Sequence, residues 1–170
     1  MNAFDGATTV LGIVIGAYVA GVEKEFWVIW SGLGATIAMG FSGFAGAYMT
    51  EEAERTKKLN RLEKSMLKKL ENSVVGKASR FAPLWAGVLD GGSPAVAAIA
   101  CLAPFFLSSS GAFSIDFAIQ LSIAIALSVM FLLGVFLGKV SDRSMLLHGA
   151  KMLIVGLILT LLFLVLKVIT

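Results

Sequence analysis

The sequence predicts an all-α integral membrane protein with five transmembrane helices and a cytoplasmic helical extension between spans two and three. Of its 170 residues, 58% are hydrophobic and only 15% are charged, whereas a soluble domain carries about 25% charged residues. Mean hydropathy is +0.89, and the apolar runs approach the ~20 residues that a helix needs to cross the hydrocarbon core. The predicted spans, all in one domain of residues 1–170, cover 4–22, 26–49, 81–107, 115–137 and 148–169.

Short polar segments separate these spans. Residues 23–25, Glu-Lys-Glu, form a tight turn, and the long charged segment 50–80 follows the second span. Pro83 suits the first turn of the third helix, because its missing N–H has no helical partner there anyway. Residues 108–114 form a polar link without Lys or Arg, and residues 138–147 form a loop before the fifth span.

The distribution of Lys and Arg predicts the orientation. Nine of these residues lie in the segment 50–80, and Lys139 and Arg143 lie in the loop after the fourth span. The other two loops together hold only Lys24. Loops rich in Lys and Arg stay in the cytoplasm, so we expect a cytoplasmic N-terminus and a C-terminus outside.

Composition also limits the classes of function. One cysteine and one histidine allow neither an intramolecular disulfide nor a zinc site built on several imidazoles. The N-terminus lacks a basic region and a small-residue cleavage site, so we expect no cleaved signal peptide. The net charge of +3 is concentrated in one segment, and no nucleic-acid partner is expected. There is no catalytic triad, phosphate loop or nucleotide fingerprint, so we do not expect an enzyme.

The segment 50–80 is predicted to be one helix that continues the second span. Its apolar residues recur at helical spacing: Leu59, Leu62, Met66, Leu70 and Val74. One interpretation is a basic amphipathic helix that binds membrane lipid headgroups or its copy in a dimer. The other is a lobe that collects metal ions through acids such as Glu51 and Glu54. The excess of basic residues repels cations and favours the first interpretation.

An Asp-Gly-Gly-Ser-Pro stretch starting at Asp90 stands inside the third span. A carboxylate within a span costs about 2.5–3.5 kcal/mol on insertion scales and marks a functional site or a buried pair. Gly91 and Gly92 allow another backbone or an ion to come close. Pro94 cannot donate to the Asp90 carbonyl, so we expect a helix kink and a free carbonyl. These hard oxygen ligands suit a cation; the alternative is an Asp90 paired with a basic loop residue.

A similar stretch opens the first span. There, Asp5 and a glycine are followed by Thr8 and Thr9, just as Asp90 and a glycine are followed by Ser93. Both spans start from the cytoplasmic side, so the two halves form a weak parallel repeat, or the match is chance. Paired glycine-rich helices in a repeat point to a transport site. The predicted metal ligands are Asp5 and Asp90, with Thr8, Thr9 and Ser93 nearby.

Four short motifs then identify a resemblance. They are residues 5–12 (DGATTVLG), 42–48 (SGFAGAY), 103–106 (APFF) and 138–144 (GKVSDRS). Together with five spans and a charged segment after the second, they resemble the vacuolar iron transporter family over nearly the whole chain.

The resemblance implies a homodimer that moves Fe2+ or Mn2+ out of the cytosol in exchange for protons. The divalent ion is its substrate, and no other cofactor is implied. The ion path would run between the first spans of the two subunits, and the Asp of the family's first motif corresponds to Asp5. The alternative is a family member that does not transport and acts as a structural or partner-binding membrane protein.

The second motif differs from the family pattern, Ser-Met-x-x-Gly-Glu-Tyr. The family's Met falls at Gly43 and its Glu at Ala47. Asp90 could replace the lost carboxylate, and Met39 or Met49 on span two could supply a sulfur ligand.

Overall fold

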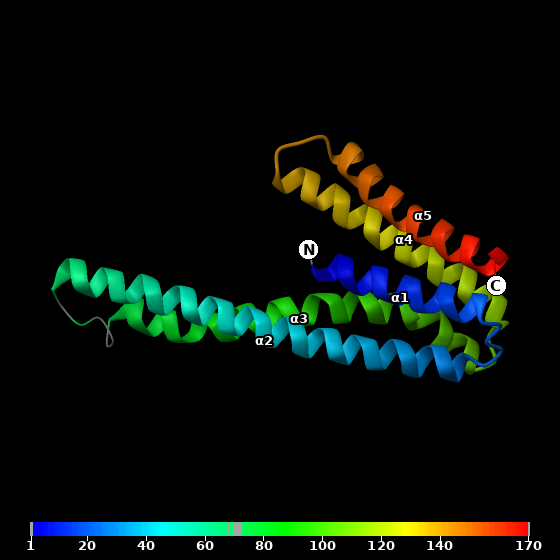
Figure 1. Cartoon of the computed structure of the whole chain (residues 1–170), viewed down its shortest axis with the longest axis horizontal. Coiled ribbons are helices and arrows are strands. Elements are labelled where there is room, and N and C mark those ends of the chain that lie inside the picture. Colours follow the sequence, from blue (N-terminus) through cyan, green and yellow to red (C-terminus); the bar gives the residue numbers. More distant parts are fainter. Residues whose placement is uncertain (1, 68, 70–72, 170) are drawn as a thin grey trace.

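The computed structural model describes residues 2–67, 69 and 73–169, with side-chain surroundings up to residue 165. This part of the chain forms five helices and no strand (Figure 1). Their bounds are α1 Asn2–Val19, α2 Glu25–Met66, α3 Val74–Ser109, α4 Ile115–Val140 and α5 Met145–Ile169. Each helix is long and apolar enough to cross a membrane. The all-α prediction with five such helices is therefore confirmed.

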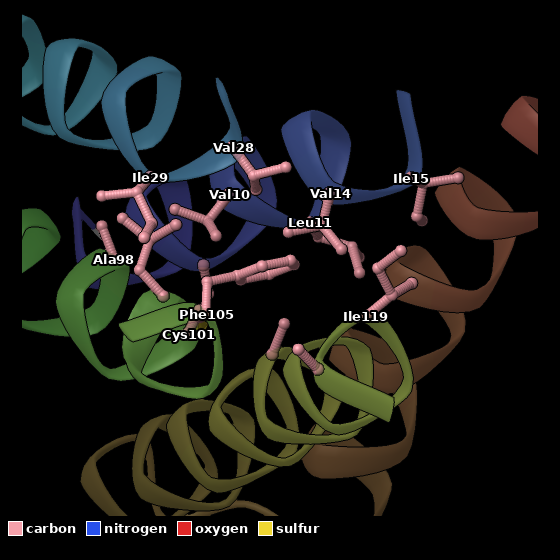
Figure 2. Close-up of a cluster of buried hydrophobic side chains, with 14 of the residues drawn as sticks. Val10, Leu11, Val14, Ile15, Val28, Ile29, Ala98, Cys101, Phe105 and Ile119 are labelled. Carbon is pink, nitrogen blue, oxygen red and sulfur yellow. The ribbon is translucent and has the colours of Figure 1, made fainter. Parts of the chain in front are cut away.

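Helix α1 is the centre of the bundle, because it contacts each of the other four helices. Helices α2 and α3 pack along each other, as do α4 and α5 (Figure 1). The core is a cluster of buried apolar side chains in which Phe105 of α3 is fully buried (Figure 2). The cluster comprises Ala7, Val10, Leu11, Val14 and Ile15 of α1, Val28 and Ile29 of α2, Ala98, Cys101, Leu102 and Phe105 of α3, and Ala118, Ile119, Ala126 and Met130 of α4.

Two polar contacts link helices inside this apolar frame. The Ser122 hydroxyl of α4 donates to the Cys101 carbonyl of α3 over 2.6 Å. At the end of α3, the Ser108 hydroxyl donates to the Glu25 carboxylate of α2 over 2.7 Å. Each gives a buried hydroxyl a partner, as apolar surroundings require.

The prediction of one helix over residues 50–80 is wrong. Helix α2 ends at Met66, and Leu67 takes the left-handed conformation, with φ 49°, and bonds its N–H to the Glu63 carbonyl. Helix α3 begins at Val74, where the Ser73 side chain accepts from the Gly76 N–H over 3.1 Å. Residues 50–66 and 74–80 form an antiparallel pair that projects from the bundle (Figure 1). We call this pair the extension.

The apolar spacing ran across this break for a physical reason. Two paired helices each need an apolar face. Apolar residues can therefore recur at helical spacing in the sequence from Leu59 to Val74, although Leu59 belongs to α2 and Val74 to α3. Val74 is 84% exposed and does not continue the face of α2. Leu70, Lys68 and Glu71 lie outside the described residues.

Several predicted boundaries also change. Pro83 lies well inside α3 and not in its first turn, and the helix also continues through Pro94 and Pro104. Helix α4 reaches Val140 and α5 starts at Met145, so the predicted loop 138–147 shrinks to residues 141–144. Helix α1 ends at Val19, before a turn in which Gly21 has a φ of 68°. A hydropathy pattern follows apolar stretches, whereas helices also continue through polar residues.

Candidate metal site at the junction of α1, α2 and α3

Helices α1 and α3 lie side by side and run in the same direction. The Asn2 side-chain amide of α1 donates to the Asp90 carbonyl of α3 over 3.2 Å. One turn on, a Cβ built on Gly6 would lie 2.8 Å from the Pro94 Cα. Both contacts join residues 88 apart, so this register places Asp5 opposite Ser93. Three residues of offset put Asp5 and Asp90 about 4.5 Å apart along the helix axis.

Gly6 makes this approach possible. Real Cβ atoms do not come this close to backbone atoms, and Gly6 also meets the Pro94 carbonyl oxygen. Any larger side chain at position 6 would separate the helices. The Asp-Gly motif of α1 therefore has a packing role as well as a carboxylate.

The Asp90 carbonyl is where the three helices meet. Pro94 leaves it without its usual helical donor, and Asn2 donates to it in place of that donor. The Ser93 hydroxyl lies 3.5 Å away, and a Cβ built on Gly43 of α2 would lie 3.1 Å away. We call Asn2, Asp5, Gly43, Asp90 and Ser93 the junction. The Asp90 carbonyl therefore accepts from both the Asn2 amide and the Ser93 hydroxyl, and the prediction that it is free for a cation is wrong.

Asn2 is a junction residue that the sequence pattern did not predict. An Asn side chain at the start of an apolar run needs a hydrogen-bond partner, and Asn2 stands at such a position in the sequence. Its partner, 88 residues away, follows only from the packing of α1 on α3.

The two junction carboxylates have no basic partner in the described chain. Asp5 is exposed and Asp90 is half-buried, and no ion pair among the described residues involves either of them. The alternative in which a loop Lys or Arg neutralises Asp90 therefore finds no support there. The described residues contain no group of three or more His, Cys, Asp and Glu that could hold a metal. An ion at the junction would be held by two carboxylates and neutral oxygens.

The hydroxyl and glycine residues have separate surroundings. The Thr8 hydroxyl donates back along α1, to Phe4 and Asp5 carbonyls at 3.0 and 3.1 Å, and Thr9 is half-buried. Gly91 is buried, and a Cβ there would lie 3.0 Å from the Phe44 backbone nitrogen. Gly92 is exposed, with nothing within 4 Å of a built Cβ. Of the two glycines, Gly91 is the one that lets α2 and α3 pack closely.

The other predicted path residues lie in different surroundings. Met39 packs against the apolar core, and Met49 is 69% exposed. Glu51 pairs with Arg55 at 2.6 Å, and Glu54 pairs with Lys58 at 3.3 Å. The structure shows these four predicted residues in the core or on the distal part of α2, so we leave them out of the junction.

The packing at Gly43 leaves little room for the Met that the resemblance would place at this position. A Cβ at Gly43 would already lie 3.2 Å from the Gly91 Cα and 3.3 Å from the Asp90 carbonyl carbon. A thioether side chain would require α2 to move away from α3. Ala47 lies one turn further along α2 and is half-buried.

Comparison with known proteins finds an archaeal relative. The chain is 36% identical over 151 residues to the Uncharacterized protein MJ0645 of Methanocaldococcus jannaschii, an alignment covering 87% of this chain and 75% of that protein. This chain belongs to the family of that archaeal protein. No family model matches the chain, and no solved structure matches it.

In this member of the MJ0645 family, the junction supplies hard oxygen atoms from two helices. Carboxylate oxygens suit Mg2+, Ca2+ and Mn2+ better than soft metals. The junction residues include no sulfur or imidazole ligand. Two carboxylates with neutral oxygens near one end of α1 are a ligand set of the kind that hard divalent cations take.

Proposed function

We propose that this chain is a multi-pass membrane protein that moves a divalent cation of the Fe2+ or Mn2+ type out of the cytosol. It acts as a homodimer and exchanges the ion for protons, as its resemblance to the vacuolar iron transporter family implies. One observation carries the proposal. Asp5 and Asp90 stand on adjacent parallel helices, offset by three residues, with no basic partner in the described chain.

The positions of the aromatic residues support insertion into a bilayer. Trp27 and Trp30 of α2 are 61% and 59% exposed and lie about 27–32 Å along the helix from Tyr48. On α3, Trp85 and Phe106 are 65% and 42% exposed and are about 32 Å apart. These separations between aromatic residues match a hydrocarbon core of about 30 Å with aromatic side chains at both interfaces.

This frame gives the depth of the proposed site. Asp90 follows Trp85 by five residues, which places it about 7–8 Å further along α3 into the bilayer. The extension carries half of the 14 Lys and Arg residues, so the positive-inside rule puts it in the cytoplasm. Asp5 and Asp90 then lie near the cytoplasmic mouth, with the N-terminus inside and the C-terminus outside.

The extension itself follows the direction of α2. One uninterrupted helix runs from Glu25 to Met66, so its last 18 residues project about 27 Å beyond Tyr48. A helix continuing out of a span in this way favours a projecting hairpin over a helix lying flat on lipid headgroups.

The carboxylates supply the proposed coupling. Near the low-dielectric core, two unpaired negative charges are unfavourable, and a divalent cation neutralises both. Protonation of the same carboxylates removes their charge and releases the ion. Proton binding and cation binding therefore exclude each other at the junction.

The test is uptake of Mn2+ and Fe2+ by proteoliposomes containing the parent protein, Asp5→Asn or Asp90→Asn. We expect each variant to lose at least tenfold in uptake, or about 1.4 kcal/mol. Asp142→Asn is the matched control, because Asp142 is exposed in the α4–α5 turn with φ 51°, and Asn tolerates that conformation. Equal uptake by all four proteins would overturn the proposal.

The second candidate is a non-transporting structural or partner-binding membrane protein. Gly43 and Ala47 favour it, because the resemblance leads to Met and Glu there and Gly43 is packed against Asp90. It predicts no uptake by the parent protein and no transition metal in elemental analysis of the purified chain. The molar mass of the purified protein in detergent, corrected for bound detergent, tests the homodimer separately.

A further inference from the structure

A polar cavity lies at the other end of α1, away from the junction. It has a volume of about 480 Å3 and is lined by the end of α1, the start of α4 and the last part of α5, which come together beside the C-terminal end in Figure 1. Its polar lining comes from Tyr18 of α1, Asp116 and Gln120 of α4, and Thr160 of α5. We call it the α1–α4–α5 cavity.

The polar groups of this cavity are oxygen donors from three helices. Asp116 and Gln120 are one helical turn apart and so share a face of α4. The Thr160 hydroxyl donates to the Gly156 carbonyl over 2.9 Å, which leaves its oxygen lone pairs to accept or to bind a cation. Among the described side chains, the cavity lining includes no Lys or Arg.

The apolar lining separates the cavity from the core. Ile15 and Ile119 are 1% and 6% exposed, line the cavity, and lie next to each other at the edge of the core cluster (Figure 2). Asp116 and Gln120 are exposed, so a cation can reach their oxygens from outside the core.

We propose that the α1–α4–α5 cavity is a second cation-binding site, which takes a hard divalent ion on Asp116, Gln120, Tyr18 and Thr160. Its role as the release site at the outer end rests on the proposed function, but its ability to bind does not. One carboxylate with neutral oxygens makes a weak site, because affinity falls with the charge of the ligand set. A weak site suits release, since conduction requires that an ion can leave.

An apolar contact separates the two sites along α1. A Cβ built on Gly12 or Gly16 would lie 3.8 or 4.0 Å from the Phe163 ring of α5. Phe163 therefore packs on α1 at the start of the cavity, on the side toward Asp5. Two sites separated by an apolar barrier are what access from alternate sides requires.

Asp116 also has an ordinary role, because it lies in the first turn of α4, where a negative charge stabilises the helix dipole. That role needs no cavity and no other oxygen donors. It also predicts no metal binding, so a binding experiment separates the two roles.

The experiment uses Tb3+, a hard oxygen-seeking ion whose luminescence is excited through a nearby tyrosine. The purified full-length protein in detergent is titrated with Tb3+, and Mn2+ is then added as competitor. We expect Tb3+ binding to give sensitised emission. Asp116→Asn should weaken the apparent affinity for Tb3+ at least tenfold, and Tyr18→Phe should lower the emission intensity. Glu23→Gln, an exposed acid in the loop at the same end, is the matched control and leaves the emission unchanged.

The double variant Asp5→Asn/Asp90→Asn distinguishes this site from the junction. Emission that persists in the double variant and disappears in Asp116→Asn supports the cavity, whatever the uptake assay gives. Emission that disappears in the double variant and persists in Asp116→Asn overturns the cavity site and leaves the proposed function standing. Gln120→Leu gives a second test that keeps the first-turn acid of α4; unchanged affinity in that variant also overturns the proposal.

Discussion

The closest contact between α1 and α3 makes Gly6→Ala a direct test of the junction. The new Cβ would lie 2.8 Å from the Pro94 Cα and carbonyl carbon. Carbon atoms prefer about 3.5–4.0 Å, so the helices would have to separate by roughly 0.7–1.2 Å. Both sides of the contact are backbone, and no change of rotamer relieves it. We expect a cost of about 1–3 kcal/mol, the range for an overpacked site.

Gly92→Ala is the matched control, because a Cβ there has nothing within 4 Å. Both substitutions gain about 0.5–1 kcal/mol of helix propensity, so this gain cancels between them. Thermal unfolding in detergent, followed by circular dichroism, measures the difference. At about 2–4 °C per kcal/mol for a chain of this length, Gly6→Ala should unfold several degrees below Gly92→Ala. Equal midpoints would refute the register of α1 on α3, and reduced uptake by Gly6→Ala alone would link it to function.

Three further predictions use the same unfolding measurement. Asn2→Ala loses its 3.2 Å bond to the Asp90 carbonyl and should cost about 0.5–1.5 kcal/mol; no change would contradict the contact. Ser108→Ala removes the 2.7 Å bond to the half-buried Glu25 carboxylate and should cost about 1.5 kcal/mol, whereas Ser109→Ala, on the exposed side of the same turn, should cost less. Leu67→Gly should stabilise the extension by about 1 kcal/mol, because Gly takes the left-handed conformation without a Cβ clash; a loss of stability would show that the Leu67 side chain contributes packing.

The Asp90 stretch shows how far sequence reasoning reaches at the site. That Pro94 deprives the Asp90 carbonyl of its helical donor follows from covalent structure alone. That Asn2 replaces this donor does not, because the contact joins two helices 88 residues apart. Ligand chemistry alone also favoured Met39, Met49, Glu51 and Glu54. Their surroundings, the core in one case and i,i+4 ion pairs in two others, depend on packing.

The sequence by itself determined that this protein consists of five long apolar helices. Hydropathy is summed over about 20 neighbouring residues, and a helix satisfies its own backbone hydrogen bonds, so neither property needs a distant partner. Only the tertiary structure decided the break at Leu67, the register that brings Gly6 onto Pro94, and the cavity around Asp116. Each depends on which faces of separate helices meet. Small residues and single hydrogen bonds decide how helices pack, and their energies are too small to produce a recognisable pattern in the local sequence.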